Sequence, residues 1–102
     1  MFGMDIMKQV QQMQERMTKL QGELADKTLT GASGGGMVTV TCNGKQEILS
    51  ISIDKTVIED GDVTMIEDLV LTAVNDALSR SRELMGEEMR ALTGGISIPG
   101  LS

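Results

Sequence analysis

Several residue types on which enzymes and nucleic-acid readers depend are missing or scarce in this chain of 102 residues. It has no histidine, tryptophan or tyrosine, and it has one phenylalanine, one proline and one cysteine. Histidine is the most common acid–base catalyst and metal ligand, so its absence removes much of the usual catalytic and metal chemistry. Phe2 alone gives no aromatic platform on which single-stranded bases could stack.

The single cysteine and the hydropathy of the chain favour a reducing compartment. Cys42 cannot form an internal disulfide, and it has no partner base that would make it a nucleophile. There is no run of about 18 apolar residues, and the N-terminus lacks the basic start and apolar middle of a signal peptide. The sequence therefore predicts a cytoplasmic protein without a membrane partner, in which Cys42 is a buried structural thiol.

The glycine-rich stretch GASGGGMVTVTCNGK, residues 31–45, partly matches a nucleotide-binding loop. Gly31 and Gly36 have the spacing of the two glycines of a P-loop. However, Met37 and Val38 occupy the positions of the lysine and hydroxyl residues that reach the phosphates and the magnesium ion. A strand pattern follows, so no helix N-terminus would face an anion. We therefore interpret the glycines as a turn. Nucleotide hydrolysis is a remote alternative, and it would show as magnesium-dependent release of phosphate.

The charge of the chain is unevenly distributed. The net charge is −6, which argues against simple electrostatic binding of nucleic acid. The excess acid lies within residues 56–76, whereas residues 1–27 and 77–90 are each neutral. The acidic stretch lacks the spaced ligand set of a calcium-binding loop, so we expect it to be solvated. From these exclusions we expect no enzyme, with no catalytic residue, no metal site and no cofactor.

Apolar residues recur with helical spacing near the N-terminus. Between residues 6 and 24 their separations are 4, 3, 4, 3 and 4, which is the spacing of a heptad seam. This pattern predicts an amphipathic helix over about residues 4–25. The seam residues are Ile6, Val10, Met13, Met17, Leu20 and Leu24.

A β region follows this helix. The chain alternates between apolar residues and threonine or serine, which is typical of half-buried strands. Asn43 and Gly44 predict a type I′ hairpin turn, in which both central residues need a positive φ. We expect a three-stranded antiparallel meander over about residues 27–33, 36–43 and 46–54. The apolar residues expected to face inward are Val38, Val40, Cys42, Leu49, Ile51 and Ile53.

A second, longer helix is predicted over about residues 64–93. Thr64 and Glu67 have the spacing of a capping box, and we interpret residues 56–62 before them as a loop. The helix ends at paired glycines, and we expect residues 94–102 to form a flexible tail. Its seam residues are Leu69, Ala73, Val74 and Ala77. Residues 1–102 are therefore expected to form one α+β domain of order α-β-β-β-α.

The predicted helix lengths indicate more than one copy of the chain. At 1.5 Å per residue the second helix would be about 40 Å long and the first about 30 Å. A compact domain of this size has a radius of gyration of only about 13 Å. The helices would therefore project beyond the sheet with apolar seams in water, so we predict a tight, obligate homodimer.

Taken together, these elements resemble the YbaB/EbfC family of bacterial nucleoid-associated proteins over essentially the whole length of the chain. The resemblance is carried by the first helix MKQVQQMQERMTKLQGEL and by the segments GGGMVTVTCNGK, ILSISID, IEDLVLTAVNDAL and GGISIPG. It implies an α-β-β-β-α fold, a homodimer with a tweezer-like outline, and binding to double-stranded DNA. It also implies a nucleoid-associated role in organising DNA or modulating expression.

The family pattern supplies no base-reading motif, so our DNA-contact candidates depend on charge and helix placement. Long basic and glutamine side chains can bind phosphates without reading bases. An alternative function is a dimeric protein-interaction or adaptor module that uses the methionine-rich helical seams. The predicted DNA-binding residues are Lys8, Arg16, Lys19, Arg80, Arg82 and Arg90.

Overall fold

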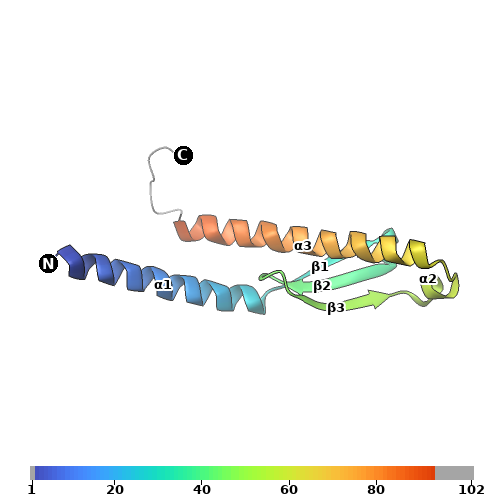
Figure 1. The fold of residues 1–102 in the computed structure, drawn as a ribbon, viewed down its shortest axis with the longest axis horizontal. Coiled ribbons are helices and arrows are strands. Elements are labelled where there is room, and N and C mark those ends of the chain that lie inside the picture. Colours follow the sequence, from blue (N-terminus) through green and yellow to red (C-terminus); the bar gives the residue numbers. More distant parts are fainter. Residues whose placement is uncertain (1, 94–102) are drawn as a thin grey trace.

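The computed structural model describes residues 2–93, which form two long helices and one small sheet (Figure 1). The elements are α1 (Phe2–Asp26), β1 (Thr28–Ser33), the 3₁₀ turn η1 (Gly34–Gly36), β2 (Val38–Asn43), β3 (Ile48–Ile53), α2 (Lys55–Glu59) and α3 (Val63–Thr93). The strands are antiparallel in the order β1-β2-β3. This confirms the predicted α-β-β-β-α order and the meander, whereas the predicted tail lies outside the described residues.

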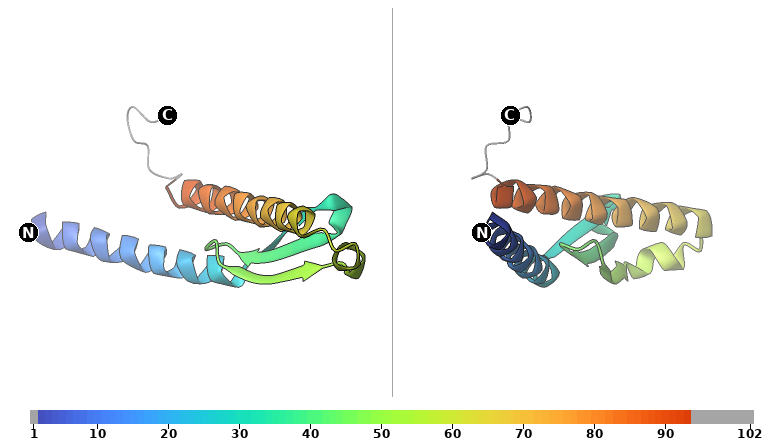
Figure 2. Two further views of the ribbon diagram at one scale, coloured as in Figure 1. Left: turned by 45° about the vertical axis from the view of Figure 1, so that its right-hand side comes forward. Right: turned by 60° about the vertical axis from the view of Figure 1, so that its left-hand side comes forward.

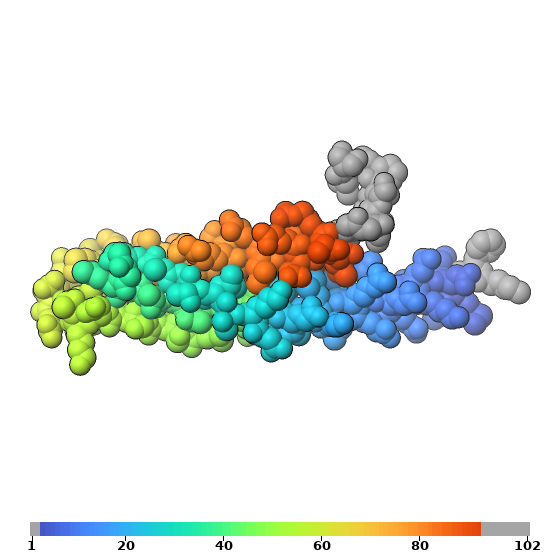
Figure 3. All heavy atoms as spheres, turned by 180° about the vertical axis from the view of Figure 1, so that it is seen from behind, coloured from blue at the N-terminus to red at the C-terminus, as the bar shows by residue number. Residues whose placement is uncertain are grey.

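The helices make the molecule long and thin. Its principal extents are 70 × 27 × 16 Å. Figures 1 and 2 show the sheet at one end beside α3, with α1 running from the sheet toward the other end. The two helices run in opposite directions, and α1 continues beyond the end of α3 (Figure 3).

Helix α3 packs on β1 and β2 through its smallest side chains. Ala73 and Ala77 are fully buried, together with Val38, Val40 and Cys42 of β2. The Cys42 thiol donates a hydrogen bond to the Ala77 carbonyl over 3.3 Å, and burial raises the pKa of this thiol. Cys42 is thus a core residue.

Close approach of α3 requires a glycine on β1. A Cβ atom at Gly31 would lie 2.3 Å from the Ala77 nitrogen and 2.5 Å from the Ala73 carbonyl oxygen. Both are backbone atoms and cannot turn aside as a flexible side chain would. At Gly34 and Gly35 of η1 the requirement is instead conformational, because their φ values of 58° and 68° are in the left-handed region.

The β2–β3 hairpin differs from the predicted type I′ turn. The Asn43 side chain accepts hydrogen bonds from the Lys45 and Glu47 amides, and Gln46 rather than Gly44 has a positive φ, of 63°. This is a three-residue loop, a type I turn followed by a left-handed residue. Gly44 is needed for another reason. Its amide donates to the Leu24 carbonyl over 2.8 Å, and a Cβ there would lie 2.7 Å from that oxygen.

The expected burial of β3 is correct for Ile53, which packs against the core, but within the single chain it is wrong for Leu49 and Ile51. A register shift between Thr41 and Cys42 pairs Cys42 with Ile48, so Leu49 does not continue the inward row. Ile51 pairs with buried Val40 but is 49% exposed, because α3 packs on β1 and β2 instead. Apart from Ile53, the face of β3 that continues the core is therefore open.

Two local predictions before α3 are wrong for the same reason, which is aspartate capping. Asp54 accepts a hydrogen bond from the Thr56 amide over 2.9 Å and begins the short helix α2, where a loop was predicted. Asp62, and not Thr64, accepts from the Met65 amide over 3.1 Å and begins α3. Asp62 takes the capping position first, so the predicted capping box does not form.

Candidate nucleic-acid interface

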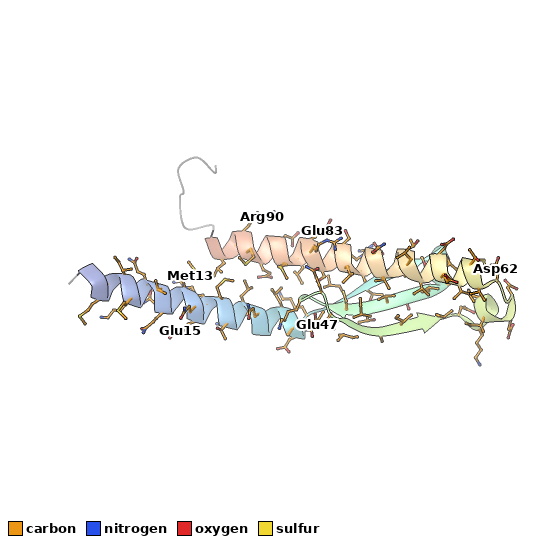
Figure 4. The ribbon with its side chains drawn as sticks, viewed as in Figure 1. Met13, Glu15, Glu47, Asp62, Glu83 and Arg90 are labelled. Carbon is orange, nitrogen blue, oxygen red and sulfur yellow. The ribbon has the colours of Figure 1, made fainter. Side chains whose placement is uncertain are left out.

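All six predicted DNA-contact residues lie on the two long helices and are exposed. Three are on α1 and three on the C-terminal half of α3, so both groups lie away from the α2 end of the molecule (Figure 1). Figure 4 labels Arg90 near the end of α3, on the far side from α1. The structure therefore places the predicted residues on two separate helices, with Arg80 beside β1 and the three α1 residues on the helix that extends from the sheet.

A groove between α1 and α3 brings two of these residues together. Arg16 and Lys19 line it from α1, and Ala91 and Leu92 line it from α3, around a volume of about 290 Å³. Glu88 also lines the groove and forms an ion pair with Lys27 at the end of α1. The hydrogen bond to the Glu88 carboxylate raises the pKa of Lys27. This ion pair ties the two helices together where they leave the sheet.

The outer face of α1 is polar. Lys19 lines an open hollow together with side chains of glutamine, threonine and glutamate, and Figure 4 shows Glu15 on the side of α1 away from α3. Lysine, glutamine and threonine can all donate hydrogen bonds to phosphate oxygens. The residues that line this hollow are Gln11, Gln14, Glu15, Thr18 and Lys19.

Arg80 is paired with a carboxylate of its own helix. Its Nε lies 3.4 Å from a carboxylate oxygen of Asp76, one helical turn earlier. Asp76 also accepts a hydrogen bond from the Ala32 amide over 3.0 Å, and this bond, with the charge of Arg80, lowers the pKa of the Asp76 carboxyl. Arg80 thus helps to join α3 to β1, and its charge is less available to DNA.

The structure adds one basic residue that sequence reasoning missed. Lys45 is exposed at the tip of the β2–β3 hairpin. That tip is held against α1 by the Gly44–Leu24 hydrogen bond, and against α3 by a 3.1 Å hydrogen bond from the Gln46 amide to the Ser81 hydroxyl. A lysine in a turn does not by itself indicate a binding site. The nearness of Lys45 to the two helices becomes visible only when the hairpin is seen to pack against them.

Acidic residues gather at the opposite end of the molecule. Around α2 and the first turns of α3 there are six carboxylates, and Lys55 is the one basic residue between positions 54 and 68. Phosphates would be repelled there and less so at the helix end. The carboxylates are those of Asp54, Glu59, Asp60, Asp62, Glu67 and Asp68.

Two other kinds of site can be assessed over residues 2–93. No cluster of acidic or thiol side chains in this part of the chain is arranged to hold a metal ion. Neither long helix there is apolar enough over sufficient length to cross a membrane.

Known proteins resemble this chain in sequence over nearly its whole length. The sequence pattern of the YbaB/EbfC DNA-binding family matches residues 1–96. A nucleoid-associated protein of Syntrophobacter fumaroxidans is 46% identical over 99 residues, which cover 97% of this chain and 90% of the relative. Nucleoid-associated protein TTE0040 of Caldanaerobacter subterraneus subsp. tengcongensis is 50% identical over 97 residues, which cover 95% of this chain and 87% of the relative.

A solved structure has the same fold. The crystal structure of the uncharacterized protein HP0035 from Helicobacter pylori superimposes with a TM-score of 0.78 at 25% sequence identity. The match covers 85% of this chain and 91% of that one. The arrangement of two long helices and a small meander therefore recurs in a relative of low identity.

Proposed function

The chain belongs to the YbaB/EbfC DNA-binding family, and from this premise we propose that it binds double-stranded DNA through the phosphates with little readout of base sequence. The observation that carries the proposal is the separation of charge along the molecule. Exposed basic side chains lie on α1 and the C-terminal half of α3, with exposed glutamines beside them on α1, and the surplus carboxylates lie at the α2 end. DNA therefore approaches the helix end.

We further propose that the binding unit is a homodimer formed through β3. Within residues 2–93 the outer edge of β3 has no neighbouring strand in the sheet, and Ile48 and Ile51 of this strand are 40% and 49% exposed. Half-buried Val70 and Val74 continue the apolar surface onto α3. A second copy paired edge to edge would satisfy the backbone groups and cover these side chains at once. Two pairs of projecting helices would then be available to one DNA duplex.

The relatives named above suggest the cellular setting. Both are called nucleoid-associated proteins, so we infer that this protein works in the cytoplasm on the nucleoid, where it organises DNA or modulates expression. We assign it no enzymatic activity and no cofactor.

A gel-shift titration at several salt concentrations tests DNA binding. Binding should weaken as salt rises, because each phosphate contact releases counterions. The triple variant Lys8→Ala/Arg16→Ala/Lys19→Ala should bind more weakly and show a smaller salt slope. Lys55→Ala, which removes an exposed lysine at the acidic end, is the matched control and should change little.

The opposite result would favour a different class of function. If no shift is seen at low salt, the adaptor alternative gains support, and its candidate surface is the exposed apolar part of α1. Light scattering tests the dimer separately. A mass of one subunit at micromolar concentration would overturn it, and Ile51→Asp should produce that mass if β3 is the interface.

A further inference from the structure

The apolar seam of α1 is covered over only half of its length. Leu24 and Leu20, near the sheet, are 3% and 7% exposed, whereas Val10 and Ile6, near the N-terminus, are 51% and 59% exposed. Met13 lies between them in sequence and in burial, and Figure 4 shows it on the side of α1 that faces α3. The seam is continuous, so the change in burial comes from what covers it.

The apolar seam of α1 is covered only as far as α3 extends beside it. The last described turns of α3 lie beside the middle of α1, since Ala91 and Leu92 line the same groove as Arg16 and Leu20. From Arg16 back to the start of α1, the helix continues for about 20 Å without α3 beside it (Figure 3). The strip left exposed or half-buried consists of Ile6, Val10 and half-buried Met13, with exposed Met7 at its flank.

The chain itself supplies a segment of the right length at the right place. Nine residues, GGISIPGLS, follow Thr93, and they contain no charged side chain. At about 3.3 Å per residue they can reach about 30 Å, which exceeds the length of the strip. Ile96, Ile98 and Leu101 give this segment three large apolar side chains. DNA is a poor occupant of the same strip, because the strip presents no basic side chain to a phosphate.

We propose that residues 94–102 bind along this strip of their own chain, running from the end of α3 toward the N-terminus of α1. The segment takes over where Leu92 stops and covers Met13, Val10 and Ile6 in turn. This contact goes beyond DNA binding and does not depend on it. Both tests below are made on the full chain without DNA, so failure of the DNA proposal would leave them unaffected.

Disulfide trapping tests the position of the segment. In Val10→Cys/Ile98→Cys, air oxidation should form a disulfide within one chain at least tenfold faster than in Gln12→Cys/Ile98→Cys. Gln12 is an exposed residue on the opposite side of α1, two positions further along the helix. Native Cys42 is fully buried and should not compete. Equal rates in the two variants, or disulfides only between chains, would overturn the proposal.

Hydrogen exchange tests the consequence for α1. Replacing the three apolar side chains, Ile96→Ser/Ile98→Ser/Leu101→Ser, should speed exchange of the amides of residues 4–13 several-fold. Ser97→Ala/Ser102→Ala is the matched control and should exchange like the wild type. Unchanged exchange of β2 amides would show that the fold is intact. If residues 4–13 also exchange at the wild-type rate in the triple variant, the contact does not exist.

Discussion

The two ends of α1 differ more than their sequences do. Both carry apolar residues at heptad spacing, yet the sheet-proximal end is buried and the N-terminal end is largely exposed in the described chain. The sheet-proximal end meets α3 and the hairpin tip, whereas the other end projects. Stability is therefore expected to concentrate around the sheet, while the polar face of the projecting helix is expected to tolerate substitution and to be available for binding.

The largest expected effect comes from adding one methyl group at the sheet. Gly31→Ala should lower the free energy of unfolding by about 3 kcal/mol, because its Cβ would collide with the α3 backbone. Gly22→Ala makes the same change on α1, where no atom lies within 4 Å of the added Cβ. It should raise stability by about 1 kcal/mol, because alanine favours a helix. Urea unfolding of the two variants measures the two changes in the free energy of unfolding, which should have opposite signs. Equal changes would contradict the expected difference between the sheet and α1.

A smaller loss is expected from opening a cavity in the core. Val40→Ala should cost about 2 kcal/mol, since the side chain is fully buried between β2 and α3. Met4→Ala removes a larger side chain from the projecting helix, where Met4 is 68% exposed, and should change stability by less than about 0.5 kcal/mol. The urea midpoints of the two variants measure these changes in stability. If Met4→Ala lowers stability as much as Val40→Ala, the N-terminal end of α1 is not loosely held.

A still smaller effect should follow pH. The bond from the Ala32 amide lowers the pKa of Asp76 below its ordinary value of 3.8. The unfolded chain therefore takes up this proton first, so the stability from Asp76 is complete at neutral pH and is lost as the pH falls below about 4. Asp76→Asn should lower the urea midpoint at pH 7, and the difference from the wild type should shrink at pH 3. Asp5→Asn on α1 is the control, and a difference that persists at pH 3 would refute the assignment.

The smallest expected effect lies at the junction of the two regions. Lys45→Ala at the hairpin tip should leave the urea midpoint unchanged. If the tip contacts one phosphate, the variant should reduce the slope of the logarithm of DNA affinity against the logarithm of salt concentration by about 1. A gel shift over a salt series measures this slope, and a slope equal to the wild type would remove Lys45 from the interface.

The sequence predicts the parts of the molecule that local patterns determine. Heptad spacing predicted α1, alternation predicted the strands, and the order of elements is confirmed. The wrong predictions concern features that are determined by contacts between residues far apart in the sequence. Gly44 reads as a type I′ turn residue, but contact with Leu24 determines its role, and the β3 register depends on a bulge that no pairwise pattern reveals.

The candidate site was less predictable than the fold. Charge and helix placement identified exposed basic residues, but they could not show that Arg80 is paired with Asp76 or that Lys45 is brought to the helices. The distribution of acid along the chain was visible in the sequence. Its segregation to one end of a 70 Å molecule required the fold, because α2 and the start of α3 turn back beside the sheet.

The position of α3 over the sheet also sets the order in which the protein can fold during synthesis. The buried hydroxyl of Ser81 donates to the Asn43 carbonyl, and these two residues are 38 positions apart. At about 5–20 residues per second, the ribosome needs about 2–8 s to make the intervening chain. Throughout that interval the apolar face of β2 has no helix to cover it, so the nascent hairpin is the stage at which this protein is most exposed to aggregation and to chaperones.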